Sequence, residues 1–194
     1  MNTPAHIAAS LLVWNKEPGW RGMLAVGLGA ALPDLPMFGF YAYQKIIGSS
    51  EHQIWSSLYF ESSWQLLFDS FNSIPFALVA AAMCFLIRQP LGVIVAMSAM
   101  LHMLCDLPVH HDDAHRHFLP LSWRFESPIS YWDPAHYGHI FAIAEFLFGI
   151  GVSGCVALRA PYAPMRWAAR LNFSLYVTVL LLVAGYWTFT HWAN

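Results

Sequence analysis

The side chains best suited to chemistry in this sequence are histidines and aspartates at helical spacing. His102 and Asp106 are four residues apart, so on a helix they project from one face, as two ligands of a single cation must. The alternative for this pair is a hydrogen bond that packs two helices together. Asp34 lies between Pro33 and Pro36 in an apolar stretch, where a carboxylate needs a cationic partner unless it is protonated.

A second group of ligand-type residues follows at once, in the segment 110–117. Seven of the ten histidines fall within residues 102–139, and imidazole with carboxylate is the usual ligand set of zinc, manganese or non-haem iron. An extended backbone would place Asp113, His115 and His117 on one side of this segment. The alternatives are a solvated loop and a pH-sensing histidine cluster.

The composition predicts that these residues are held by membrane helices. Of 194 residues, 58% are hydrophobic and 10% are charged, and the mean hydropathy is +0.48. A soluble surface needs more charge than this. The net charge of −2 gives no electrostatic footprint for nucleic acid. Three cysteines lie in apolar runs without CxxC spacing, which predicts neither a disulfide nor a zinc framework.

Five stretches approach the ~20 apolar residues that a membrane-spanning helix needs. Thr3 as an N-cap with Pro4 in the first turn predicts a further, short N-terminal helix, spanning or re-entrant. Aromatic residues mixed with polar ones in 51–71 predict interfacial helices. The five predicted spans are Gly22 to Tyr43, Ser73 to Ile87, Leu91 to Val109, His139 to Leu158 and Asn172 to Trp192.

The predicted fold class is therefore all-α: a polytopic transmembrane helix bundle, in which residues 1–194 form a single membrane-embedded domain. Its His/Asp-rich loop, residues 110–137, is predicted to be non-cytoplasmic. The predicted location is the bacterial inner (cytoplasmic) membrane, with the site facing the periplasmic side.

Basic residues in the loops predict that orientation by the positive-inside rule. Six Lys and Arg residues, Lys16 among them, lie in the loops 15–21, 88–90 and 159–171. Only three lie in the segments 44–72 and 110–137. The first set is predicted to be cytoplasmic. The opposite half of the membrane then receives four ligand-type residues from separate stretches of the chain: His6, Asp34, His102 and Asp106.

Three features of the chain carry a resemblance to a known family. At His6, the Leu32-Pro33-Asp34 step and the His102 to Asp106 pair, the chain resembles the membrane-bound metal-dependent hydrolase family of inner-membrane proteins. The resemblance covers residues 1–125, and it implies a hydrolase of transmembrane helices that uses a divalent metal.

The chain departs from that family at residues 69–73. The family has an Arg-Gly-Phe-Thr-His-Ser-like stretch there, and this chain has Asp69 and Asn72 instead of its histidine. The segments 113–118 and 130–138 resemble more closely a group of bacterial membrane proteins sometimes labelled cobalamin biosynthesis proteins. No nucleotide-binding or amidotransferase motif in the sequence supports that label.

The leading hypothesis is a metal-dependent membrane hydrolase in which metal-activated water attacks a phosphoester or other ester of a lipid-like or small anionic substrate. Asp112 or His117 would act as general base, and Arg116 and Arg124 would hold an anionic group. Membrane lipids are the expected partners. The alternatives are a non-enzymatic divalent-metal carrier or permease component and a structural protein stapled by metal. The predicted ligands of one or two divalent ions, zinc first, are His6, Asp34, His102, Asp106, His111, Asp113 and His115.

Overall fold

The computed structural model describes residues 1–14 and 19–192, with side chains described as far as Leu182. Within these residues every regular element is a helix and no strand occurs, which confirms the all-α prediction. Lys16, in the first predicted cytoplasmic loop, lies outside the described residues.

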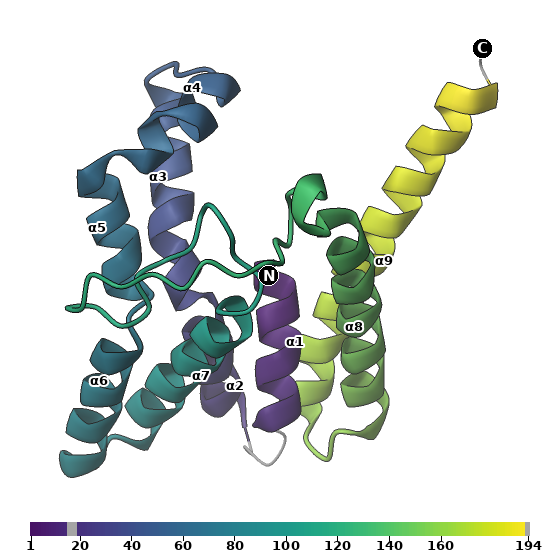
Figure 1. The fold of residues 1–194 in the computed structure, drawn as a ribbon. Helices are drawn as coiled ribbons and strands as arrows, with labels where there is room; N and C mark the ends of the chain where they lie inside the picture. Colours follow the sequence, from purple (N-terminus) through teal and green to yellow (C-terminus); the bar gives the residue numbers. More distant parts are fainter. Residues whose placement is uncertain (15–18, 193–194) are drawn as a thin grey trace.

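The helices follow one another along the chain with short connections, except for one long segment between α7 and α8 (Figure 1). The elements are α1 (Thr3–Val13), α2 (Trp20–Ala31), η1 (Leu32–Asp34), α3 (Leu35–Ile46), α4 (Glu51–Ser56), η2 (Leu58–Phe60), α5 (Ser62–Phe71), α6 (Ile74–Leu86), α7 (Pro90–Asp106), η3 (Pro134–His136), α8 (Gly138–Arg159) and α9 (Ala163–Trp192).

Two helical segments in the described part of the chain are long and apolar enough to cross a membrane. One is Trp20–Ile46, with 27 residues in α2, η1 and α3, and the other is α8, with 22 residues. The pair α5 and α6, bent by 43°, would form a third if it is one span. Fewer helices than the five predicted spans pass this test. Helix α6 has 13 residues and α7 has 17. The predicted span Asn172 to Trp192 lies in α9 and extends beyond the residues whose side chains are described, and α9 is not among the helices that pass.

Helix α1 lies between α2 and α8 and also touches α7 and α9 (Figure 1). The prediction that Thr3 caps this helix was wrong. Asn2 is the cap, since its side chain accepts from the Ala5 amide at 3.0 Å. Thr3 is already helical and donates its hydroxyl to Asp34. This start places His6, which is 1% exposed, one turn into the helix and inside the bundle.

Helices α2 and α7 approach each other closely at a glycine. A Cβ added to Gly29 would lie 2.3 Å from the Val95 carbonyl oxygen and 2.7 Å from Ser98 Cβ. Small residues allow this approach between apolar helices. The next residue, Ala30, presents its carbonyl oxygen 2.7 Å from Nδ1 of His102. Gly29 therefore sets the helix separation on which the position of His102 depends.

The Gly29→Ala variant is expected to lose about 1–3 kcal/mol of stability, because the added methyl meets backbone atoms that cannot move without parting the helices. Thermal unfolding in detergent measures this. Gly27→Ala on the same helix is the control: its Cβ would meet nothing within 4 Å, and alanine favours helix by about 1 kcal/mol over glycine. Equal unfolding midpoints for the two variants would contradict the role assigned to Gly29.

The segment 107–133 runs across the bundle between α7 and α8 without a helix or strand (Figure 1). The expectation of an extended backbone in 113–117 was wrong, because turns interrupt the segment. The segment is anchored instead by its main chain. The His117 carbonyl accepts from the Ile74 amide at 2.8 Å and ties the segment to α6, and within the segment the Val109 carbonyl accepts from the Tyr131 amide at 2.9 Å.

Candidate metal site

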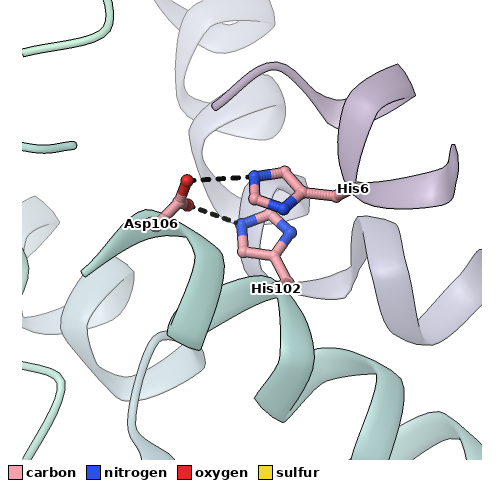
Figure 2. A group of neighbouring side chains, drawn as sticks. All are labelled: His6, His102 and Asp106. Carbon is pink, nitrogen blue, oxygen red and sulfur yellow. Dashed lines mark ion pairs between the residues drawn. The ribbon is translucent and has the colours of Figure 1, made fainter. Parts of the chain in front are cut away.

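Three buried side chains from two helices converge on one point. His6 comes from α1, and His102 and Asp106 come from α7, as Figure 2 shows. Nε2 of His6 lies 3.0 Å from Asp106 Oδ1, and Nε2 of His102 lies 2.9 Å from Oδ2. One ligand atom from each residue lies within 4.8 Å of the others. Two imidazoles and a carboxylate so arranged can hold a metal ion.

The two imidazole rings present nitrogens that lack hydrogen-bond partners. The rings of His6 and His102 stack with centroids 3.5 Å apart. Nδ1 of His102 donates to the Ala30 carbonyl, so in the neutral ring Nε2 carries the lone pair, an arrangement typical of metal-bound histidine. In the described residues, the ion-pair partner nearest to each Nε2 is the Asp106 carboxylate, at 3.0 Å from His6 and 2.9 Å from His102, and neither contact has hydrogen-bond geometry. A cation between these groups would be coordinated by both imidazole nitrogens and by the carboxylate.

Asp106 is the most strongly cation-attracting group of the site. Its side chain is 4% exposed, and the Met1 amino group lies 2.5 Å from Oδ1. His110, one helical turn further along the chain, places Nε2 3.5 Å from the same oxygen. Positive or hydrogen-donating groups therefore surround this carboxylate on several sides.

Asp34 lies beside the three central residues, as the sequence predicts. Its Oδ1 is 3.5 Å from His102 Nε2, and Thr3 donates its hydroxyl to Oδ2. The 3₁₀ turn η1 ends at Asp34, where Pro33 interrupts regular α-helix. The Pro33 carbonyl accepts from Asn72 Nδ2 at 3.3 Å. The break in the helix thus directs both a carboxylate and main-chain carbonyls into the bundle.

A pocket of about 300 Å³ reaches the site through Asp34 and Asp106. His110, Asp113 and His115 also line it. Nδ1 of His110 lies 3.0 Å from Asp113 Oδ2. Two of the ligands predicted in the His-rich segment, Asp113 and His115, therefore lie on the pocket wall beside the central residues.

The two arginines predicted to hold an anionic substrate lie against Asp69 instead. Asp69, fully buried on α5, accepts from the Arg116 amide at 2.9 Å and from Arg116 Nε at 2.5 Å. Nη2 of Arg124 lies 3.6 Å from the same carboxylate, and Nδ1 of His115 lies 3.5 Å from it. Neither arginine is among the described residues that line the pocket.

The two residues predicted as general bases also lie outside the pocket. Asp112 is exposed. His117 is buried, with Nδ1 3.0 Å from the Asn72 carbonyl. Burial and the neighbouring His115 lower the pKa of His117 to about 4, so its ring is neutral at pH 7.

His111, predicted as a metal ligand, lies apart from the three central residues. Its ring stacks on His136 with centroids 3.7 Å apart. Its Nδ1 donates to the Ser127 carbonyl at 2.7 Å. His136 is held in turn by Asp133, whose Oδ2 lies 2.6 Å from Nδ1.

Sequence reasoning missed two contributors to the site. His110 was left out of the predicted ligands, although its spacing of four from Asp106 repeats the spacing of His102 to Asp106 and was a usable signal. The Ala30 carbonyl, which orients His102, has no sequence signal because any residue carries one.

No protein-family model, curated protein or solved structure matches this chain.

Proposed function

We propose that this chain is an integral membrane hydrolase that cleaves an ester, with a phosphoester as the first candidate, at a divalent metal held by His6, His102 and Asp106. The observation that carries the proposal is the burial of these three ligand groups beside a pocket that reaches them through Asp34 and Asp106. Catalytic metal sites keep one position open to water and substrate, whereas structural sites are closed. The pocket supplies that open side.

The exposed apolar side chains support a membrane location. Phe85 and Leu86 on α6 are 74% and 77% exposed, and Leu158 on α8 is 84% exposed. Such surfaces are unfavourable in water but match lipid. We propose the five predicted spans in a bacterial inner membrane, with the site toward the periplasmic side, on the strength of the loop charges. The resemblance to the membrane-bound metal-dependent hydrolase family supports the same assignment.

Two imidazoles and one carboxylate are a ligand set found at catalytic zinc sites and at non-haem iron(II) sites, and zinc is our first candidate. When bound, such an ion lowers the pKa of a coordinated water to about 7 and so supplies a nucleophile at neutral pH. With a metal bound, His6 and His102 would each supply a neutral imidazole nitrogen from a buried position, and Asp106 would supply a compensating negative charge.

Asp34 is the carboxylate placed to accept the proton of the attacking water. It lines the pocket, lies beside His102, and keeps 14% of its side chain exposed, so it is reachable by solvent. The hydroxyl of Thr3 fixes one oxygen and leaves Oδ1 free of that contact. Water then adds to the ester, and the leaving oxygen departs with the proton that Asp34 returns.

The groups deeper than the site favour hydrolysis over metal transport. Ser10 and Ser98 lie one helical turn beyond His6 and His102, and both hydroxyls are buried. Beyond them lies a hydrophobic core cluster that includes Leu11, Met23, Val26 and Ile94. A carrier needs polar groups that continue toward the other face of the membrane. This apolar cluster supports a site that opens on one side.

Metal content tests the first half of the proposal. Elemental analysis of detergent-purified protein is expected to find about one zinc-like divalent ion per chain. Protein that holds no ion after dialysis against zinc, and gains none on titration, would overturn it.

Hydrolysis tests the second half. Metal-loaded protein is expected to cleave a phosphoester or carboxylic ester in a substrate panel, and the Asp34→Asn variant is expected to retain metal while losing about 100-fold or more of the rate. Metal-loaded protein that cleaves nothing but moves ions into liposomes would favour the carrier.

A further inference from the structure

A second cavity, of about 440 Å³, lies beside the metal pocket and shares part of its wall. We refer to it as the aromatic cleft. The residues common to both cavities are Met37, Tyr59, Asp113 and Tyr131. A molecule that occupies the aromatic cleft can therefore extend a second group into the pocket that reaches Asp106.

Aromatic rings from two distant parts of the chain form most of this cleft. Trp55, Tyr59 and Phe60 come from α4 and η2, and Tyr131 and Trp132 precede η3. Contacts fix several of these rings: the centroids of Trp55 and Tyr59 are 5.9 Å apart, and those of Tyr59 and Phe60 are 5.0 Å apart. Tyr59 is buried, whereas Trp55, Phe60 and Trp132 are 44%, 46% and 51% exposed and supply aromatic surface that a ligand can contact.

The polar groups of the cleft are acidic. Asp112 and Asp113 line it, and no Lys or Arg is among the described residues that do so. Asp113 lies 3.0 Å from His110 Nδ1 and accepts from Trp132 Nε1 at 3.2 Å. Asp112, which is exposed, makes no ion pair with any described residue. The cleft thus keeps a negative charge that an occupant can neutralise.

We propose that the aromatic cleft binds the ammonium head group, primary or quaternary, of a membrane lipid. Ring faces attract an organic cation, and a carboxylate strengthens that attraction. An acyl chain would gain nothing from Asp112, and an inorganic divalent ion needs oxygen or nitrogen ligands rather than ring faces. An organic cation would interact both with the aromatic rings and with the carboxylates of the cleft wall.

The position of the cleft then identifies the class of substrate, a step that rests on the proposed function. In an amino-alcohol phospholipid the ammonium and the phosphoester belong to one head group. The shared wall at Tyr59, Asp113 and Tyr131 lets the ammonium stay in the cleft while the phosphoester enters the pocket beside Asp106. A phosphoester of an amino alcohol is therefore the substrate class that fits both cavities.

Native mass spectrometry of metal-stripped protein in a maltoside detergent tests the binding step without turnover. Phosphatidylcholine, phosphatidylethanolamine and phosphatidylglycerol with identical acyl chains are compared. The two ammonium lipids are expected to be retained about fivefold or more above phosphatidylglycerol. Choline is expected to displace the two ammonium lipids. Its uncharged isostere, 3,3-dimethylbutan-1-ol, is expected to leave them bound.

Variants separate the cleft from the rest of the surface. Trp132→Ala and Asp112→Asn are expected to reduce retention to the phosphatidylglycerol level, and Trp132→Phe, which keeps a ring face, is expected to restore most of it. Trp123→Ala and Glu126→Gln are controls, because both residues are exposed in the same segment and do not line the cleft. Asp112→Asn alters an exposed side chain and carries the test if Trp132→Ala fails to fold.

Equal retention of the three lipids, or cleft variants that match the controls, would overturn this inference. Lipid preference without any hydrolysis would remove the proposed function and leave the cleft assignment standing. Hydrolysis of esters without any lipid preference would overturn the cleft assignment and leave the proposed function standing.

Discussion

The Asp106→Asn variant is expected to bind divalent transition metals more than about 100-fold more weakly than the native chain, since losing even an outer-shell partner costs 10–100-fold. Asp106 is the one negative charge among the three converging groups, and both imidazoles lie within 3.0 Å of its oxygens. The amide of asparagine would place an NH2 group or a neutral oxygen there. Neither compensates the charge of the ion.

Isothermal titration and metal-dependent thermal unfolding measure this effect. At a metal concentration 100 times Kd, binding adds about 2.7 kcal/mol, which corresponds to about 5–11 °C in a chain of this length. The native chain is expected to show that rise in unfolding midpoint on adding metal, whereas the Asp106→Asn variant is expected to show none. Asp112→Asn, an exposed carboxylate outside the site, is the matched control and is expected to keep the rise.

The same measurement distinguishes a metal site from a simple packing contact. If His6, His102 and Asp106 only hold α1 against α7 by hydrogen bonds, the native chain will show no metal-dependent rise. Asp106→Asn would then lower the unfolding midpoint equally with and without chelator.

The Asp69→Asn variant is expected to lose about 3 kcal/mol of stability, or about 6–12 °C in unfolding midpoint. Asp69 is fully buried and faces Arg116, Arg124 and His115. Removing one partner of a buried ion pair leaves the other charges uncompensated. The effect lies at the lower end of the usual range because the two arginine side chains remain 25% and 33% exposed.

Because Asp69 fastens the segment 107–133 to α5, its loss should also loosen the wall of the metal pocket. Limited proteolysis is expected to cut Asp69→Asn within this segment faster than the native chain. Asp133→Asn serves as the control, since Asp133 lies at the end of the same segment but is partly exposed and its carboxylate contacts only residues close to it in sequence, His136 and the Ala135 amide, among the described residues. Unfolding midpoints that agree within about 1 °C for both variants would contradict the anchoring role.

Much of the helical architecture and the centre of the candidate site could be predicted from the sequence. Apolar runs of adequate length mark helices regardless of their partners, and the four-residue spacing of His102 and Asp106 is a property of one helix. His6 and Asp34 could be added because each is an ionisable group in an apolar stretch and needs a partner. The three residues that could hold a metal are among those predicted.

The rest could not be predicted because it depends on tertiary contacts. The segment 107–133 has no periodic pattern, so nothing in its sequence separates Asp113 and His115, which line the pocket, from His111, which stacks on His136. Arg116 and Arg124 have the same sequence character whether they meet a substrate or Asp69. Only the fold brings a buried carboxylate from α5 against them.

The two helices that supply the site lie far apart along the chain, and this has a consequence for biosynthesis. A ribosome that adds about 5–20 residues per second completes α1 several seconds before it reaches His102. During that interval neither His102 nor Asp106 has been made, so the proposed metal site is incomplete. The complete ligand set of the proposed metal site therefore exists only once α7 has been made.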